Sequence, residues 1–529
     1  MEFSEISTRN ELADFLGIPR NVLSYVLYVK HVETYYTTFD IPKKDGSARH
    51  ICAPSGELKA IQSRLKDAMY EFRMNTKERD CKRAKVSQAF EQGKSIITNA
   101  DIHRNKRYVI GFDLKDFFDS FNFGRVSGYF EKNRYFKFPH EVAIVLAQLC
   151  CYNGVLPQGA PTSPIITNMI SEILDARLLK LARKYKLDYT RYADDLTFST
   201  NNNKYLAVHN NFLEEVVEEI KSSGFSLNEA KTHITYRDSQ QVVTGLIVNR
   251  KINVPRTYYK ATRAMWHSYY SNGHFTIKGK EGNVRQLEGR FSFIDQVEHY
   301  NNCKSPKEKK HDSHNLSSKE KEYRNFLFYT HFVSNPTPIL LTEGKTDVLY
   351  IKAALMKLYK EYPTLIQRDD NGKYRFNISF FNRTNHWNYF FDMSRDGADA
   401  MSKIYTNYFS NGQNSLSAYF QKRKALSSNK PVLFLFDNEC NTKGKPLQSF
   451  VGKLPHSDER KKELQKSNHL LLDTYCHLYL VTLPLPADMA ECELEDLFPQ
   501  DVLHTKIRGR SFSRKDEDPH LYYNKDIFF

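Results

Sequence analysis

The sequence predicts two successive architectures, an α+β half followed by an α/β half built on a mainly parallel sheet. Helical and strand patterns mix over residues 1–300, whereas apolar strands alternate with helical stretches after residue 326, as in parallel α/β sheets. Between them, residues 301–325 hold eleven charged residues in twenty-five and almost nothing apolar. We interpret this segment as a solvated linker, with a surface helix as the less favoured alternative.

Composition excludes several classes of protein. The 529 residues are 40% hydrophobic and 26% charged, which indicates a folded chain that is not disordered. No apolar run approaches the length of a membrane-spanning helix, and the polar start MEFSEIST predicts no signal peptide. Eight cysteines, none spaced C-x-x-C, argue against a disulfide framework or a structural zinc site and favour a reducing cytoplasm.

The net charge of +15 is uneven along the chain. Residues 1–300 carry a net +9, while 301–325 and 326–529 carry +3 each. A basic N-terminal half suits a partner with a phosphate backbone, although ordinary solubility would explain it equally well.

Clear patterns in the first half predict its main elements. The apolar run YVIGFDL (108–114) predicts a buried strand that ends at Asp113. Residues 187–200 predict two short strands around a tight turn that carries Asp194 and Asp195. Apolar residues at helical spacing predict helices at 141–152, 163–185 and 206–223.

Short apolar runs in the second half predict strands at 338–342, 376–380, 431–436 and 477–483, with a helix at 347–359. The carboxyl ends of neighbouring parallel strands meet at one edge of a sheet, where such folds bind ligands.

Asp113, Asp194 and Asp195 stand at the ends of predicted strands. Adjacent aspartates disfavour joint ionisation, and a divalent cation removes that cost. Two Mg²⁺ ions about 3.5–4 Å apart would activate an attacking 3′-hydroxyl and steady a leaving pyrophosphate. A lone Asp-Asp pair more often lies in a solvated turn. The surrounding sequence therefore decides whether these aspartates are predicted to bind metal.

The surroundings resemble reverse transcriptases. GFDLKDFFDSF (111–121), LPQGAPTSPIITN (156–168), RYADDLTFST (191–200) and NEAKTHI (228–234) resemble motifs A to D of these enzymes, in order and spacing. KKDGSARHICAP (43–54) and LKAIQSRL (58–65) resemble their fingers motifs. NADIH (99–103) and Val243-Thr244-Gly245 resemble two signatures of bacterial retron enzymes, on the group II intron-like branch.

This resemblance assigns roles to single residues. It implies that Asp113, Asp194 and Asp195 are metal ligands. Arg49, with Lys43 or Lys44, would hold the incoming triphosphate, and Gln158 and Gly159 would lie against the new base pair. Phe118 would exclude a sugar 2′-hydroxyl, with core packing as its alternative. Lys231 would protonate pyrophosphate, with a surface lysine as its alternative.

The RNA-binding residues implied by the resemblance form two groups. Asn99, His103 and Val243–Gly245 belong to the retron signatures, and Lys260 and Arg263 to a predicted thumb. Cations and aromatics interleave in that thumb, as suits a nucleic-acid surface; they include Lys251, Arg256, Tyr258, Tyr259 and Trp266.

The second half resembles the Toprim domain of nucleases. Glu343 follows one predicted strand, in TEGKTD (342–347), and Asp437 and Glu439 follow another. Converging carboxylates at strand ends predict a site for one or two Mg²⁺ ions. Glu439 stands where the family has a second aspartate, and whether Glu495 or Asp496 joins the site stays open.

Together the resemblances imply a right-hand polymerase fused to a Toprim-like domain. The expected parts are fingers (1–108), palm (109–250), thumb (251–300), a charged linker (301–325) and a Toprim-like domain (326–529). The polymerase would use dNTPs to copy part of a cognate structured RNA into a branched RNA–DNA, in the bacterial cytoplasm and away from membranes. The Toprim-like half would act on a nucleic acid in defence against bacteriophage, and assembly with the RNA–DNA is expected.

Two alternatives remain at this point. The Toprim-like half could be a non-catalytic module for nucleic-acid binding or assembly, which the glutamate at position 439 favours. The polymerase could also belong to a bacterial defence system other than a retron.

Overall fold

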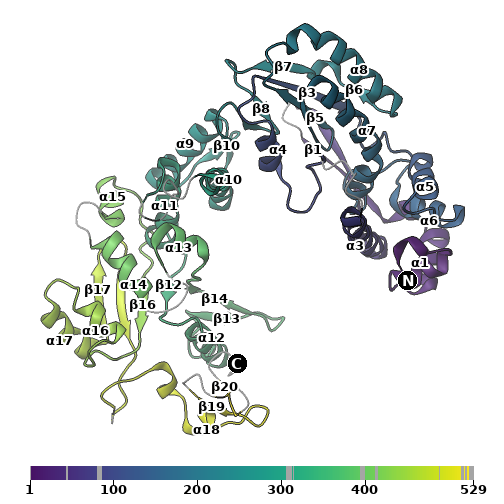
Figure 1. The fold of residues 1–529 in the computed structure, drawn as a ribbon. Coiled ribbons are helices and arrows are strands. Elements are labelled where there is room, and N and C mark those ends of the chain that lie inside the picture. The colour runs from purple at the N-terminus through teal and green to yellow at the C-terminus, as the bar shows by residue number, and fades with distance from the viewer. Residues whose placement is uncertain are drawn as a thin grey trace. The chain divides into compact units, whose positions relative to one another are not determined.

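The computed structural model describes residues 2–42, 46–79, 86–305, 313, 315–393, 399–410, 415–487, 489–513, 518 and 521–523. The chain forms two compact units, residues 1–255 and 256–529, which follow one another in the colours of Figure 1. None of the helices in the described ranges is long and apolar enough to cross a bilayer.

Helices and short strands mix in the N-terminal unit. Its helices are α1 (Arg9–Phe15), α2 (Arg20–Ser24), α3 (Gly56–Arg79), α4 (Ile96–Ile102), α5 (Phe123–Lys132), α6 (His140–Cys150), α7 (Ser163–Tyr185) and α8 (His209–Ser222). Its strands are β1 (Tyr36–Pro42), β2 (Ala48–Pro54), β3 (Tyr108–Lys115), β4 (Asp188–Tyr192), β5 (Asp195–Thr200), β6 (Ser226–Leu227), β7 (His233–Tyr236), β8 (Val242–Val243) and β9 (Leu246–Ile247). The helices and strands expected here all form, and α7 has the expected bounds.

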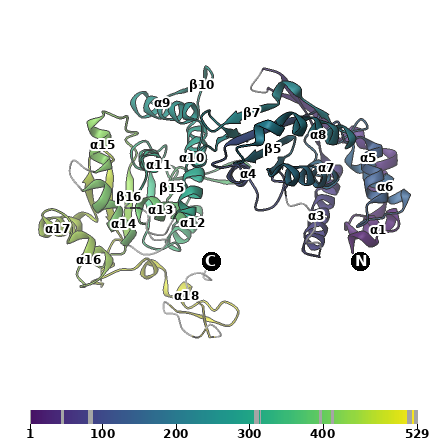
Figure 2. The same cartoon turned by 45° about the horizontal axis from the view of Figure 1, so that its top comes forward.

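An antiparallel sheet lies at the centre of this unit. Its order is β4-β5-β3-β6, and β7 also pairs with β3. Helices α7 and α8 pack on one face (Figures 1 and 2), where the Phe198 and Phe212 rings meet at 5.1 Å and the Tyr189 hydroxyl donates to Asp175. Because side chains alternate along a strand, Thr190 and Ser199 face the opposite side, towards α4.

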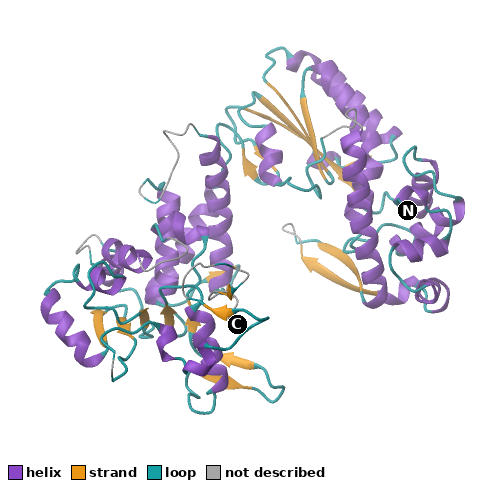
Figure 3. Cartoon of the chain, turned by 60° about the horizontal axis from the view of Figure 1, so that its bottom comes forward, coloured by secondary structure: helices purple, strands orange, loops and turns teal. Residues whose placement is uncertain are grey.

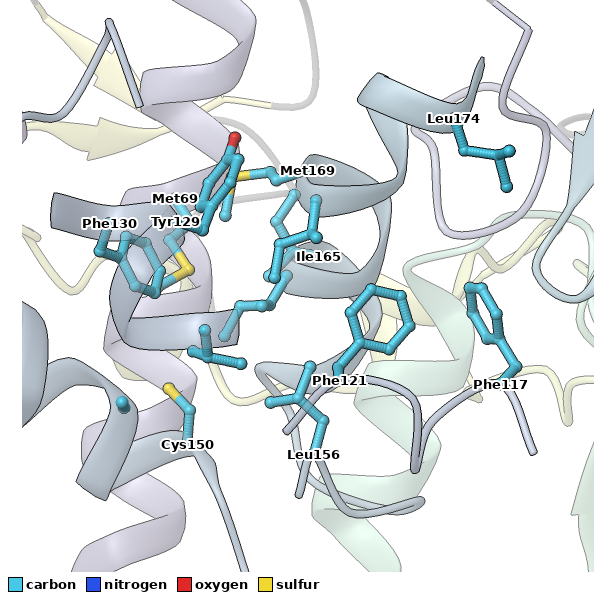
Figure 4. Close-up of a cluster of buried hydrophobic side chains, with 14 of the residues drawn as sticks. Met69, Phe117, Phe121, Tyr129, Phe130, Cys150, Leu156, Ile165, Met169 and Leu174 are labelled. Carbon is cyan, nitrogen blue, oxygen red and sulfur yellow. The ribbon is translucent and has the colours of Figure 1, made fainter. Parts of the chain in front are cut away.

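The core of the N-terminal unit joins its helices to the loop after β3. Figure 4 shows this cluster of buried side chains, which includes Met69, Phe117, Phe121, Tyr129, Phe130, Cys150, Leu156, Ile165, Met169 and Leu174. One fully buried ion pair crosses it, because the Arg191 guanidinium of β4 donates twice to the Asp175 carboxylate of α7 at 2.8 Å. Breaking such a pair costs about 3–5 kcal/mol, so it holds the strand before Asp194 firmly on α7.

The C-terminal unit combines helices with a second sheet. Its helices are α9 (Arg256–Asn272), α10 (Val284–Lys304), α11 (Ser318–Phe328), α12 (Asp347–Lys357), α13 (Asn385–Phe391), α14 (Asp399–Ile404), α15 (Leu416–Lys422), α16 (Pro446–Val451), α17 (Ser457–Ser467) and α18 (Gln500–Leu503). Its strands are β10 (Thr276–Ile277), β11 (Lys280–Glu281), β12 (Ile339–Leu341), β13 (Ile366–Arg368), β14 (Tyr374–Phe376), β15 (Ser379–Phe380), β16 (Val432–Phe436), β17 (His469–Asp473), β18 (Leu478–Thr482), β19 (Ser511–Phe512) and β20 (Tyr522–Tyr523).

The main sheet of this unit has the order β15-β12-β16-β18-β17. Strand β12 is parallel to both β15 and β16, and β16 is parallel to β18, whereas the edge strand β17 is antiparallel. Figure 3 shows these strands in orange with helices around them. The prediction of a mainly parallel α/β sheet is therefore confirmed, with β12 between the two strands it pairs with.

The segment expected to be a linker differs from that expectation. Helix α10 continues to Lys304, and α11 begins at Ser318 with a capping box formed by Ser317 and Glu320; residues 306–312 and 314 lie outside the described residues. Tyr323 is buried and its ring stacks on Phe291 at 5.6 Å. The prediction of a solvated linker from composition is wrong for 315–325, because the few apolar residues of this segment all pack against a large aromatic cluster.

The same cluster ties the expected thumb to the second half of the chain. Trp266 of α9 packs against Phe326 at 5.4 Å and Phe420 at 6.0 Å. Residues 256–300 thus belong to one compact unit with residues 326–529, instead of standing before a tether.

Candidate functional site

The predicted catalytic aspartates lie at one end of the central strands of the N-terminal unit. Asp113 on β3 pairs directly with Asp195 on β5. Tyr192 also pairs with Asp195, so Ala193 and Asp194 form a two-residue hairpin loop in which Ala193 has a left-handed φ of 57°. The antiparallel register brings the three carboxylates to one place.

These carboxylates repel one another. Burial, followed by the charges of Asp194 and Asp113, raises the pKa of Asp195 to about 6, and burial also raises the pKa of Asp194. Lys231 offsets part of this charge, because its Nζ lies 3.0 Å from Asp113 Oδ1. Asn228 Nδ2 donates to Asp113 Oδ2, also at 3.0 Å. Lys231 therefore lies at the acidic group and not elsewhere on the surface.

The donor set suits a hard divalent cation. Asp113, Asp194 and Asp195 offer only carboxylate oxygens, which Mg²⁺ prefers, and a cation would relieve the repulsion that adds to burial in raising the pKa values of Asp194 and Asp195. Across the residues that the structure describes, no three acidic, histidine or cysteine side chains are already arranged as a metal cluster. At this site the Lys231 ammonium lies on the Asp113 carboxylate instead.

The expected nucleotide-binding residues lie on β2 and the loop beside it. The Gln158 carbonyl accepts a hydrogen bond from the Cys52 N–H at 2.8 Å. A Cβ at Gly159 would stand 2.8 Å from the Cys52 carbonyl oxygen, and φ there is 123°, so only glycine fits. Exposed Arg49 on β2 opposes the rise in the Asp194 pKa, so its charge reaches the acids. Lys43 and Lys44 lie outside the described residues.

Phe118 follows β3, the strand that carries Asp113. Its ring is half-buried and packs edge-on against Phe117 at 5.6 Å, at the border of the core. This position is compatible with both of its predicted roles, the exclusion of a 2′-hydroxyl and core packing.

Asn99 and His103 are fully buried, which corrects the expectation that they contact RNA. His103 Nε2 and Nδ1 lie 2.7 Å from the hydroxyls of Thr190 and Ser199. The Thr190 hydroxyl donates its single proton to Asn99 Oδ1 at 2.6 Å, so it accepts from Nε2–H, and Nδ1 accepts from Ser199. Burial, with a smaller contribution from the charge of Lys106, lowers the pKa of His103 to about 3.

This buried network reaches the second retron signature. Asn99 Nδ2 donates to Thr244 Oγ1 at 3.5 Å, and that hydroxyl donates to the Ile96 carbonyl at 3.2 Å. Thr244 and Gly245 have φ of 46° and 81° in the tight turn between β8 and β9. A β-branched residue rarely adopts such a φ, so α4 holds a strained turn in place.

The turn also borders the predicted catalytic aspartates. A cavity of about 520 Å³ is lined by Asp113, Asp195, Lys231 and Val243–Gly245, among others. Val243 is buried, so of this signature Thr244 and Gly245 present the more accessible surface. The two signatures are thus joined by the hydrogen bond between Asn99 and Thr244, and together they hold the turn that lies beside Asp113 and Asp195.

The predicted thumb residues lie on α9 in the C-terminal unit. Lys260 and Arg263 are exposed, and Arg263 lies 3.4 Å from Glu322. Trp266 is only 2% exposed, so it packs the core and is not a stacking platform for bases. Tyr258 is covered by the Arg290 guanidinium at 3.9 Å.

A second acidic group lies at the carboxyl ends of β12 and β16. Glu343 Oε1 accepts a hydrogen bond from the Asp437 N–H at 3.0 Å. Burial and the Asp437 charge raise the pKa of Glu343 to about 8. Burial, followed by the charges of Asp347 and Glu495, raises the pKa of Asp437 to about 7. These acids again offer only oxygen donors with excess negative charge, which suits Mg²⁺.

The structure distinguishes the other acids of this group. Glu439 is buried and its carboxylate is bound by the Lys445 ammonium. Glu495 is 1% exposed and acts on Asp437, whereas the Asp496 carboxylate accepts from the Glu493 N–H as part of a turn. Of these two acids, Glu495 is the one whose charge contributes to the raised pKa of Asp437.

Sequence reasoning missed several residues that support these sites. Asn228, Thr190 and Ser199 hold catalytic or supporting groups through hydrogen bonds. For Thr190 and Ser199, polar residues at inward positions of apolar strands were the available signal, since a buried hydroxyl needs a partner. No sequence pattern indicated that Lys445 would bind the Glu439 carboxylate.

Comparison with known proteins agrees with the first site. Residues 41–269 match the family model described as "Reverse transcriptase (RNA-dependent DNA polymerase)". The chain is 33% identical over 293 residues to the retron Ec86 reverse transcriptase of Escherichia coli, covering 55% of this chain and 85% of that protein. It is 33% identical over 325 residues to the retron Mx162 reverse transcriptase of Myxococcus xanthus, covering 55% of this chain and 64% of that protein.

Among solved structures, the apo telomerase of Candida tropicalis aligns over 57% of this chain and 61% of its own, with 14% identity and a TM-score of 0.34. The family assignment rests on the sequence matches.

Proposed function

The chain belongs to the family of retron reverse transcriptases, and we propose that it copies part of a cognate structured RNA into a branched RNA–DNA product from dNTPs. The observation that carries this proposal is the β3–β5 register, which sets Asp113 opposite Asp195 and beside Lys231. Family membership also argues against a defence polymerase outside retrons.

The chain's own residues have distinct tasks in this proposal. Asp113, Asp194 and Asp195 would hold two Mg²⁺ ions, which when bound lower the pKa of the attacking hydroxyl and neutralise the leaving pyrophosphate. Arg49 would bind phosphate oxygens of the incoming nucleotide. Lys231, which holds a proton at Nζ 3.0 Å from Asp113, would deliver it to the departing pyrophosphate.

The test is the double substitution Asp194→Ala and Asp195→Ala in the full chain. Primer extension on RNA should be lost while the fold survives, because removing two mutually repelling charges costs little packing. Asp238→Ala, an exposed aspartate of the same unit, is the matched control and should extend normally. Extension by the double variant near the wild-type rate would refute the assignment.

We further propose that residues 326–529, within the C-terminal unit, form a Toprim-like, Mg²⁺-dependent nuclease that acts in antiphage defence. The support is the convergence of Glu343 and Asp437 at the ends of adjacent parallel strands, with Asp347 and Glu495 near enough to raise the Asp437 pKa. Three or more such carboxylates would hold one or two metal ions at the edge of the sheet.

A non-catalytic binding or assembly module is the second candidate for this unit. The observation in its favour is the Lys445 ammonium on Glu439, which already neutralises one expected ligand. In that case the acidic group would be a structural remnant.

The substitution Glu343→Gln distinguishes the nuclease from the non-catalytic binding module. It removes one carboxylate charge with almost no change in shape, and Glu361→Gln, an exposed glutamate of the same unit, is the control. Both are expressed with the cognate RNA, and the RNA–DNA product and protection from phage are measured. Product retained with protection lost supports the nuclease. Product and protection both retained supports the binding module.

A further inference from the structure

A cavity of about 510 Å³ lies beside the second acidic group, at the carboxyl ends of β12 and β15. Its lining includes the cations Lys345, Lys352 and Arg383 together with Thr342, Asn382 and Thr384, and no acidic residue. A concave site with several cations and neutral hydrogen-bonding groups is suited to an anion.

The end of β12 separates this cavity from the acids. Strand β12 lies between β15 and β16 in the sheet. The Glu343 side chain reaches the β16 side, where it binds the Asp437 N–H at 3.0 Å. Thr342 and Gly344, on either side of Glu343 in sequence, line the cavity on the β15 side. At the end of β12, the acidic side chains therefore lie on the β16 side and the cations on the β15 side.

Each cation is held in a different way. Arg383 Nη2 donates to the Glu343 carbonyl at 2.7 Å and to the Thr342 carbonyl, which fixes it to the strand end. Lys352 Nζ lies 4.9 Å from the centre of the Phe380 ring. Lys345 is exposed just before α12. Within the part of the chain that the structure describes, neither lysine forms an ion pair with an acid, so their charge is available to a ligand.

We propose that this cavity binds a phosphate group of a polynucleotide strand and so holds the strand at the acidic group. The inference rests on the proposed Toprim-like function, because it explains how a polyanion approaches carboxylates that would otherwise repel it. Ordinary solvated lysines would be scattered, whereas Lys345, just before α12, and Lys352, on α12 itself, both border one cavity together with Arg383.

The test is lysine footprinting of the full chain in EDTA, which keeps any metal-dependent cleavage out of the measurement. Acetylation of each lysine is followed by mass spectrometry without ligand, with a single-stranded oligonucleotide, and with a mononucleotide at equal phosphate concentration. At ten times the dissociation constant, the oligonucleotide should slow acetylation of Lys345 and Lys352 about tenfold. Lys357, which points out from the same helix beyond the cavity lining, is the reference and should be unchanged.

Two results overturn the proposal: no protection of either lysine by the oligonucleotide, or equal protection by the mononucleotide. A second arm uses a photoreactive oligonucleotide and maps its crosslinks, where Lys345→Gln with Lys352→Gln should remove crosslinks to residues 339–352. Persistence of those crosslinks in the double variant also overturns it. Protection in a Glu343→Gln chain that still defends against phage would retain the phosphate site while rejecting the nuclease.

Discussion

His103 should make the N-terminal unit sensitive to acid. Its pKa in the folded protein is about 3, because it is buried, whereas an unfolded histidine titrates near 6.5. As pH falls below about 6.5 the unfolded chain gains a proton that the folded chain refuses, so stability is lost progressively from there towards pH 3. At pH 5 the difference from the unfolded value is about 1.5 pH units, or about 2 kcal/mol.

His103→Gln isolates this contribution. At pH 7.5 the substitution should cost about 1–3 kcal/mol, since the hydroxyl of Thr190 or Ser199 loses its buried partner. At pH 5 the wild type has itself lost about 2 kcal/mol, so the gap between the two proteins should close by about that amount. The buried network also supports the Thr244 turn, so DNA synthesis by the variant should fall at both pH values.

The assay must report on one unit, because a chain of two compact units need not unfold in one step. Urea titrations are therefore followed by hydrogen exchange of peptides that cover β4 and β5. His140→Gln is the control, because the His140 side chain is 74% exposed and lies outside the buried network around His103. A gap between wild type and His103→Gln that stays constant from pH 7.5 to pH 5 would refute the neutral, buried histidine.

Two further predictions concern the nucleotide-binding side. Phe118→Ala should raise ribonucleotide incorporation relative to deoxynucleotide incorporation on an RNA template; an unchanged ratio with intact DNA synthesis would assign Phe118 to the core alone. Gly159→Ala should lower DNA synthesis and cost about 1–3 kcal/mol, since its Cβ would meet the Cys52 carbonyl at 2.8 Å. Gly154→Ala, at a φ of 79° with nothing within 4 Å, measures the backbone strain alone, and an equal effect of both would show that the close approach is unimportant.

Local patterns in the sequence were sufficient for the main elements and for the acids at their ends. The apolar run that ends at Asp113 and Leu114 predicted the buried strand β3, and periodicity over 163–185 predicted α7 with the bounds it has. The same logic placed Glu343 and Asp437 after parallel strands that proved to be neighbours. Such features depend on residues that are close in sequence, so they can be predicted from a single sequence.

Only the tertiary structure decided where polar and aromatic side chains point. His103 has its partner Ser199 at a separation of 96 residues, and Trp266 meets Phe420, so neither their burial nor their exclusion from RNA contact could be judged locally. Residues 315–325 look unable to pack until the aromatic cluster that receives Tyr323 is known. A side chain is buried when segments that are distant in sequence cover it. The free energy of that contact depends on both segments, so it cannot be judged from the sequence of either one alone.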